Sequence, residues 1–275
     1  MKIFISADIE GVACVTHRDH VKMEGPEYET ARRWMTQETN AAIEGAMEAG
    51  AKEIVVADGH GHMRNILPDD LHEDVQLIRG TPRPLLQMEG LDDSFAAVFF
   101  IGHHAQANDG LGILAHTFVG QIVYDLKLNG VPVSEVIFNA AVAAHYGVPV
   151  ALSAGDDRLA ADVTANMPWV EHVITKWALS PTAARNLTPR ASQKKIRRAA
   201  KKALERLQEM QIYQIDRPIR FEVSFKEPLQ AYLPAAIPGV EQVNGRTLAY
   251  QGEDMIEISR IWRLMINAAL SNFTV

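Results

Sequence analysis

Residues 2–11 of the 275-residue chain read Lys2-Ile3-Phe4-Ile5-Ser6-Ala7-Asp8-Ile9-Glu10-Gly11. The apolar first half is typical of a buried strand, and two carboxylates follow where that strand ends. Side chains alternate faces along a strand, so we expect Asp8 and Glu10 to point the same way, with Ile9 opposite. The segment therefore predicts a buried strand that presents two carboxylates at its carboxyl end.

Two further apolar runs end in histidines. Residues 54–57 precede Asp58-Gly59-His60-Gly61-His62, and residues 96–101 precede Gly102-His103-His104-Ala105. In an open α/β sheet, sites form beyond the carboxyl ends of the strands, so these three ends are expected to meet. If the third strand continues, His103 and His104 point to opposite faces and at most one easily joins a common site. Carboxylates with histidines have the composition of a metal site, and a bridging carboxylate would allow two metal ions.

Helix and strand patterns alternate through the first two thirds of the chain. A helix is expected from Pro26 to about Ala49, with Gly50 as its stop signal. Further strand-like runs cover residues 75–78 and 148–152, with a helix over residues 134–145 and Asp156 as the N-cap of the next helix. This alternation predicts the α/β class, with a mostly parallel sheet covered by helices.

The pattern changes near Pro189, where a long helix begins whose basic residues surround a single apolar stripe. The stripe consists of Ile196, Ala200, Ala203, Leu204, Leu207 and Met210, which indicates a solvated basic face rather than a nucleic-acid site. A strand-like run over residues 219–225 and a closing helix over about 252–269 complete a smaller α+β C-terminal region. We therefore predict a metal-binding, catalytic α/β domain over residues 1–188 and an α+β region over residues 189–275.

Composition excludes several classes of protein. The net charge of −7 argues against nucleic acid as the main partner. No apolar run is long enough to span a membrane, and Asp8 and Glu10 interrupt the only N-terminal apolar run that resembles a signal peptide. The single cysteine, Cys14, excludes an intrachain disulfide and a cysteine-based zinc site. We expect a soluble, cytoplasmic protein.

Two polar residues have no clear role from their own context. His116 follows the glycine-containing segment Gly110-Leu111-Gly112, and a histidine there is more often structural than catalytic. Glu135 lies in the first turn of a predicted helix, where the helix dipole is a sufficient reason for a carboxylate. The sequence has no His-Glu-x-x-His helix, no Gly-x-Ser-x-Gly elbow and no Gly-rich phosphate or dinucleotide loop.

Several motifs, taken in order, resemble the zinc-dependent D-aminopeptidase family. They cover residues 6–11, 58–65, 101–105, 115–117, 129–140 and 147–157. The resemblance implies a binuclear zinc centre with Asp8 as the bridging ligand and His116 as the catalytic histidine. The implied zinc ligands are Asp8, Glu10, His60, His104 and Glu135. His62 and His103 add imidazoles beside these positions, and the chain beyond Pro189 matches less clearly.

The resemblance also implies activity and assembly. A metallo-aminopeptidase of this family would hydrolyse the N-terminal peptide bond of short peptides, with a preference for D-amino acids. Its subunits would assemble into a homo-oligomer, in decameric rings, and the apolar stretch Tyr232-Leu233-Pro234-Ala235-Ala236-Ile237-Pro238 is a candidate contact surface.

Two other classes of function stay open. A different binuclear hydrolase could act on another amide or on a phosphoester through the same metal ions. A phosphoesterase would be expected to supply cations for the phosphate, and Arg64 is the only cation within the motifs. The other class is a non-enzymatic metal- or peptide-binding protein.

Overall fold

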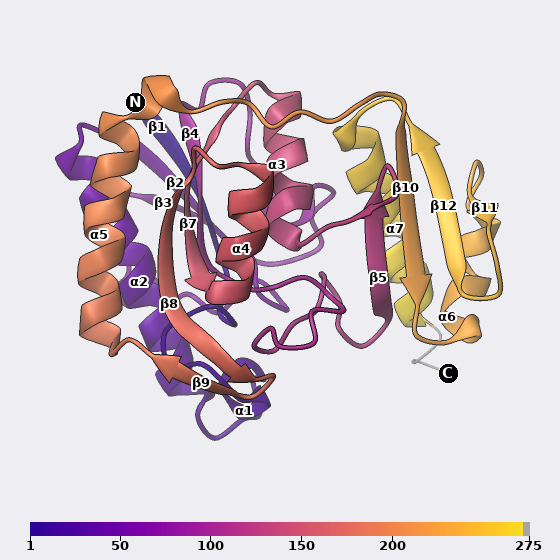
Figure 1. Cartoon of the computed structure of the whole chain (residues 1–275), viewed down its shortest axis with the longest axis horizontal. Coiled ribbons are helices and arrows are strands. Elements are labelled where there is room, and N and C mark those ends of the chain that lie inside the picture. The colour runs from indigo at the N-terminus through magenta and orange to yellow at the C-terminus, as the bar shows by residue number, and fades with distance from the viewer. Residues whose placement is uncertain (272–275) are drawn as a thin grey trace.

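A seven-stranded sheet, sheet A, is the centre of the fold in the computed structural model, which describes residues 1–271 (Figure 1). Its strand order is β3-β2-β1-β4-β7-β8-β9, and all neighbours are parallel except β8 and β9. The strands are β1 (Lys2–Ala7), β2 (Glu53–Asp58), β3 (Gln76–Ile78), β4 (Ala97–His103), β7 (Val150–Asp156), β8 (Glu171–Ser180) and β9 (Ala183–Asn186). Because β1 pairs with both β2 and β4, the carboxyl ends of these three strands lie side by side.

Helices cover both faces of sheet A. On one face lie α2 (Tyr28–Glu48) and α5 (Pro189–Glu205), and on the other lie α3 (Glu135–His145) and α4 (Asp157–Asn166). Strand side chains alternate, so Ile3 and Ile5 share an apolar core with α2 and α5, whereas Phe4 belongs to the opposite core. Sheet A is thus buried on both sides, which is the usual state of a parallel sheet.

Short helical segments complete the connections. They are α1 (Arg18–Val21), α6 (Pro228–Tyr232) and the 3₁₀ helices Pro68–Asp70, Leu86–Met88, Leu207–Glu209 and Pro234–Ala236.

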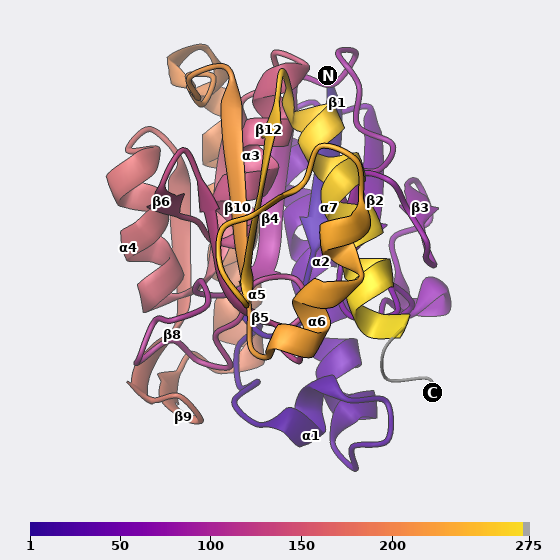
Figure 2. The same ribbon diagram turned by 90° about the vertical axis from the view of Figure 1, so that its right-hand side faces the viewer.

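A second sheet, sheet B, is antiparallel and lies beside α3 and α4, as Figure 1 shows. Its order is β11-β12-β10-β5-β6, formed by β5 (Val123–Leu128), β6 (Val131–Pro132), β10 (Ile219–Phe225), β11 (Glu241–Gln242) and β12 (Thr247–Gly252). Figure 2 looks onto this sheet and onto α7 (Met255–Ser271), which packs against it. The indole of Trp262 in α7 is fully buried and contacts the rings of Phe118 and Phe221.

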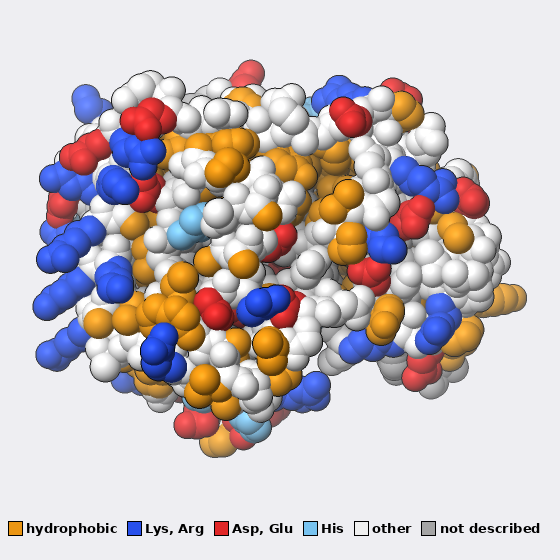
Figure 3. All heavy atoms as spheres, viewed as in Figure 1, with side chains coloured by type: hydrophobic (Ala, Val, Ile, Leu, Met, Phe, Trp, Pro, Cys, Tyr) orange, Lys and Arg blue, Asp and Glu red, His pale blue; other side chains and the backbone are white. Residues whose placement is uncertain are grey.

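The long basic helix behaves as its apolar stripe predicts. Ile196, Ala200, Ala203 and Leu204 of α5 are buried, and Figure 3 shows Lys and Arg side chains gathered along the edge that α5 forms. Arg197 forms ion pairs with Glu44 and Glu48 of α2. The basic residues are therefore the outer face of a core helix.

The predicted fold class is confirmed: a mostly parallel sheet covered by helices, with a separate antiparallel sheet. Asp156 caps α4 as predicted, because its carboxylate accepts a hydrogen bond from the Leu159 amide at 2.7 Å.

The predicted division of the chain between residues 188 and 189 stays a prediction. Sheet B takes β5 and β6 from before that point and β10, β11 and β12 from after it. Within residues 1–271, none of the helices combines the length and the apolar character that crossing a bilayer requires.

Candidate metal centre

The carboxyl edge of sheet A brings together residues from four separate segments. Asp8 and Glu10 follow β1, His60 follows β2, His104 follows β4, and Glu135 begins α3. The two carboxylates after β1, Glu135 and His104 are each at most 3% exposed. The predicted convergence of three strand ends is therefore observed, and the N-terminus of α3 adds a third carboxylate.

Asp8 lies at the centre of this cluster and presents one oxygen to each side. Its Oδ1 is 3.3 Å from Nδ1 of His60, and its Oδ2 is 3.7 Å from Nε2 of His104. On the first side, His60 Nδ1 is also 3.0 Å from Glu10 Oε2. On the other, His104 Nε2 is 3.4 Å from Glu135 Oε1. The cluster thus has two halves that share the Asp8 carboxylate.

His60 and His104 each turn their second ring nitrogen to a backbone carbonyl. His60 Nε2 lies 2.7 Å from the Val21 oxygen, and His104 Nδ1 lies 2.8 Å from the Ala105 oxygen. A carbonyl oxygen only accepts hydrogen bonds, so the ring N–H lies on that side. In the neutral ring, the nitrogen that faces the carboxylates then carries a lone pair. This arrangement fixes the tautomer in the way that is usual for metal-ligating histidines.

Several polar atoms of the cluster are buried and face only other polar atoms of the cluster, with no regular hydrogen bond within residues 1–271. They are Glu10 Oε2, His103 Nδ1 and His104 Nε2. Buried polar atoms are rarely left unpaired, because the loss of water is then not compensated. Lone pairs of nitrogen and oxygen that face one another favour a cation between them. The set of oxygen and imidazole donors fits zinc.

The charges in the cluster shift the pKa values strongly. Burial, followed by the charge of Glu10, raises the pKa of Asp8 to about 7. Burial alone would lower the pKa of His104, but its contact with Glu135 and the charges of Glu10 and Asp8 raise it to about 10. Both shifts show that the carboxylates need positive charge beside them, supplied by protons or by metal ions.

His103 and His104 both lie close to Asp8, so the expectation that at most one of them joins a common site was wrong. A β-bulge between Ile101 and His103, with Gly102 at φ +72°, breaks the alternation of the strand. Nδ1 of His103 consequently lies 3.8 Å from Asp8 Oδ2, on the same oxygen as His104. Nε2 of His103 contacts the Ser6 hydroxyl at 3.2 Å.

His116 covers the cluster from a loop. Its ring stacks on that of His104 at 4.2 Å, and its Nε2 lies about as far from Glu10 as from Glu135, at 4.0 and 3.9 Å. Nδ1 faces the Leu114 carbonyl at 2.9 Å. Burial, followed by the charge of His104, lowers the pKa of His116. Its side chain is nevertheless 23% exposed, against 1% for His104, so His116 is the more accessible ring.

Glu135 is held by contacts that the helix dipole does not explain. Its Oε1 accepts a hydrogen bond from the Phe118 amide at 2.6 Å, and its Oε2 accepts one from the Gln87 side chain. Oε1 of Gln87 in turn accepts from Asn139 Nδ2 at 2.5 Å. Gln87 was missed by sequence reasoning, because a glutamine in a short connection carries no signal. Glu135 belongs to the cluster as well as to the helix N-terminus.

Asp58 builds the turn that carries His60. Its carboxylate accepts hydrogen bonds from the backbone amides of Asn65 and Ile66, at 2.5 and 2.7 Å, and from Asn65 Nδ2 at 2.7 Å. Asn65 Nδ2 also donates to the carbonyl of His60 at 2.7 Å. His62, in the same turn, is exposed. Of the two histidines in this motif, the structure therefore places only His60 in the cluster.

Three sets of residues have ligand atoms close enough to hold one metal ion, among the residues that the structure describes. They are Asp8 with Glu10 and His104, His104 with His116 and Glu135, and Asp8 with His103 and Glu135. All three overlap in this one cluster.

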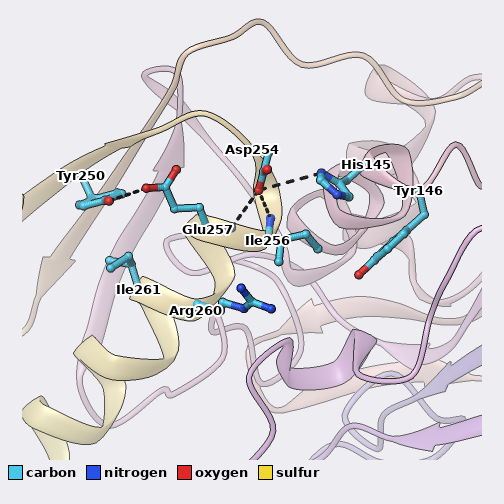
Figure 4. A pocket seen from close by; sticks show the side chains of 8 residues that line it. All are labelled: His145, Tyr146, Tyr250, Asp254, Ile256, Glu257, Arg260 and Ile261. Atoms are coloured by element: carbon cyan, nitrogen blue, oxygen red, sulfur yellow. Dashed lines mark hydrogen bonds and ion pairs between the residues drawn. The ribbon is translucent and has the colours of Figure 1, made fainter.

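A separate cavity of about 480 Å³ lies at the other end of α3, between His145, Tyr146, Asp254 and Arg260 (Figure 4). It contains none of the cluster residues.

Comparison with known proteins finds similarity over almost the whole chain. The model of the D-aminopeptidase family of peptidases, M55, matches residues 1–264. A D-aminopeptidase of Bacillus subtilis (strain 168) is 32% identical over 272 residues, which is 98% of each chain. A solved structure, the Zn-dependent D-aminopeptidase DppA from Bacillus subtilis, a self-compartmentalizing protease, is similar with a TM-score of 0.94 at 31% identity, over 98% of both chains. The matched range, residues 1–264, contains both sheets and the segments that carry the cluster.

The role of Asp58 predicts a specific loss of stability. Asparagine at this position keeps only one acceptor oxygen and turns an NH₂ group toward backbone N–H groups. We expect Asp58→Asn to lower the free energy of unfolding by roughly 1.5–3 kcal/mol, the scale of hydrogen bonds to a charged group. The melting temperature should fall by several degrees in a calorimetric scan. His62→Ala, in the same turn, is the control and should melt like the wild type; an unchanged melting temperature for Asp58→Asn would contradict this role.

Proposed function

Because the chain belongs to the D-aminopeptidase family, whose members hydrolyse peptide bonds, we propose that it is a binuclear zinc aminopeptidase. It would remove the N-terminal residue of short peptides, with a preference for D-amino acids. The observation that carries this proposal is the convergence of three buried carboxylates and two imidazoles whose lone pairs face them. Metal binding is what such a donor set does best.

The two halves of the cluster suggest how two zinc ions would be held. Glu10 and His60 would serve one ion, and His104 and Glu135 the other. Asp8 would bridge, since its two oxygens face the two halves. Cys14 would take no part, since it belongs to none of the three candidate ligand sets and its sulfur contacts the Leu187 carbonyl at 3.5 Å. Zinc held by these residues would supply a water of lowered pKa and a positive charge to polarise the scissile carbonyl.

His116 would act on the substrate. Its Nδ1–H is held by the Leu114 carbonyl, which leaves the Nε2 lone pair directed toward Glu10 and Glu135. The lowered pKa keeps this nitrogen free to accept a proton near neutral pH, and the protonated ring can then pass it to the leaving amine. Its greater exposure supports contact with the substrate rather than with metal alone.

The other functions considered are less well supported. A phosphoesterase needs cations at the phosphate, but Arg64 is exposed, and the buried Arg83 donates to the backbone carbonyls of Asp58, Ile78 and Gly80. A non-enzymatic binding protein would have no use for an accessible His116 above the cluster. A cytoplasmic location stays a prediction.

The first test of the proposed function is a panel of short peptides that differ in the chirality of the N-terminal residue. With zinc-loaded protein, we expect release of the free N-terminal amino acid, faster for D- than for L-residues, measured by chromatography of the products. N-acetylated peptides are the control and should not be cleaved, because an aminopeptidase requires a free amine. Turnover of a phosphoester without release of any amino acid would replace the proposal by its alternative.

A second prediction separates His116 from the metal ligands. His116→Ala should retain the metal content of the wild type, about two zinc ions per chain. Its kcat should fall by roughly a hundred- to ten-thousand-fold, the contribution of a positioned acid or base. His104→Ala is the matched control: it should lose metal, with activity partly recovered in excess zinc. Elemental analysis and steady-state kinetics check both variants, and near-normal turnover with a lowered melting temperature in His116→Ala would make His116 a structural residue.

A third prediction concerns assembly. We propose that the chain forms a homo-oligomer, in decameric rings, because the related DppA is a self-compartmentalizing protease. Tyr232 and Leu233, in the predicted contact surface, are 73% and 41% exposed. Light scattering should give a mass several times that of one chain, and Tyr232→Glu with Leu233→Glu should lower it. A wild-type mass near 30.4 kDa would refute assembly; an unchanged mass for the double variant would place the interface elsewhere.

A further inference from the structure

A buried lysine lies close to the cluster, and among the residues that the structure describes its hydrogen bonds all go to main-chain oxygens. Lys176 of β8 is 0% exposed. Its ammonium group donates hydrogen bonds to the carbonyl oxygens of Glu10, Val12 and Val15, the second of them at 3.0 Å. All three acceptor residues lie in the loop that follows β1 and carries Glu10. Residues 10–15 are hereafter the Glu10 segment.

Each N–H donor of the Lys176 ammonium group has a hydrogen-bond acceptor. An ammonium group has three donors, and each of them meets one carbonyl of the Glu10 segment. Burial of a charge is costly unless hydrogen bonds replace its water, so this match is required for the lysine to lie there. Three carbonyl oxygens of one short segment therefore converge on one point, the ammonium group of Lys176 on β8.

Other side chains hold the same segment. The Thr175 hydroxyl donates to the Gly11 carbonyl at 2.6 Å, and Glu38 Oε1 accepts from the Ala13 amide at 3.1 Å. A Cβ atom on Gly11 would lie 1.8 Å from the His103 carbonyl oxygen, so the segment also presses against the end of β4. The Cys14 amide also donates to Oδ1 of Asn186 in β9 at 3.0 Å. The Glu10 segment is therefore a loop held by side chains from β8, β9 and α2.

We propose that Lys176 is a positioning residue: as a cation attached to β8, it fixes the backbone of the Glu10 segment so that the Glu10 carboxylate faces His60 and Asp8. This inference rests on the proposed role of Glu10 as a metal ligand. Lys176 touches no substrate and no metal-facing atom, because its contacts are with main-chain oxygens. Its effect on the metal centre acts through the loop.

The alternative is that Lys176 only stabilises the fold. Loss of a buried, fully paired ammonium lowers stability in either case, so a melting curve cannot decide. The two roles differ in whether loss of Lys176 affects residues 10–15 and zinc binding specifically or only the stability of the whole protein. A positioning role predicts local loosening of residues 10–15 and weaker zinc binding, beyond what an equal loss of global stability produces.

The experiment compares Lys176→Met with Val173→Ala, a truncation of another buried residue of β8. In metal-free protein, hydrogen exchange of amides 10–15 should rise at least about tenfold in Lys176→Met, since these amides then open locally. Zinc affinity, measured by chelator competition, should fall by a similar factor. Val173→Ala should destabilise the protein without either local effect. Equal behaviour of the two variants would reduce Lys176 to a fold stabiliser and overturn the proposal.

Rescue gives a second readout and covers the case in which Lys176→Met does not fold. Propylammonium matches the atoms that Lys176→Ala removes, from Cγ to Nζ. Lys176→Ala, folded with millimolar propylammonium, should bind zinc nearly as the wild type does and lose affinity when the amine is dialysed away. The amine should not improve zinc binding by Val173→Ala. Failure of the amine to restore zinc binding, or raised exchange with unchanged zinc affinity, would refute positioning.

These readouts are independent of peptide hydrolysis. If the peptide panel fails while exchange and zinc affinity change as expected, the proposed substrate is wrong and the positioning role stands. If amino acids are released but Lys176→Met behaves like Val173→Ala, the proposed function stands and the positioning role is wrong.

Discussion

The mutual repulsion of three buried carboxylates is the constraint on which the rest of the site depends. Asp8, Glu10 and Glu135 are at most 3% exposed and share a single small cluster. Carboxylates removed from water in this way require positive charge close by, since burial alone would protonate them. The imidazoles of His60 and His104 are oriented by backbone carbonyls, so each neutral ring offers its lone pair toward the carboxylates. Such a cluster is stable when cations lie within it, and this makes metal binding a consequence of the fold rather than an addition to it.

The order of sheet A decides which residues can meet. With β1 between β2 and β4, the segments after these strands leave the sheet at adjacent points. Gly11 and Gly102 allow the two backbones to approach closely: a Cβ atom at Gly102 would lie 2.1 Å from the Asp8 carbonyl oxygen, and one at Gly11 would lie 1.8 Å from that of His103. Substitution at either glycine would separate the ends of β1 and β4. The spacing of the ligand candidates thus depends on two residues that carry no side chain.

The sequence allowed the central strands and their polar ends to be predicted, because apolar runs followed by Asp, Glu and His have a direct physical meaning. Glu135 and His116 depended on the family resemblance, since a helix N-terminus and a loop histidine have ordinary structural explanations. Other features had no local signal. Gln87 and Lys176 contact partners 48 and 166 residues away, and β5 pairs with β10 across 93 to 102 residues. The position of His103 followed from a bulge at Gly102, which strand alternation does not anticipate.

Sheet B and α7 have a role in the site although they contribute no residue to the cluster. The loop of His116 is tied to them at two points: Lys226, directly after β10, donates to the Gly120 carbonyl, and the Phe118 ring contacts Trp262 of α7. The same loop reaches the cluster, because the Phe118 amide donates to Glu135. A shift of sheet B relative to α3 would therefore move His116 and the hydrogen bond on Glu135 together. Sheet B and α7 thus hold the loop that carries His116, the residue proposed to act on the substrate.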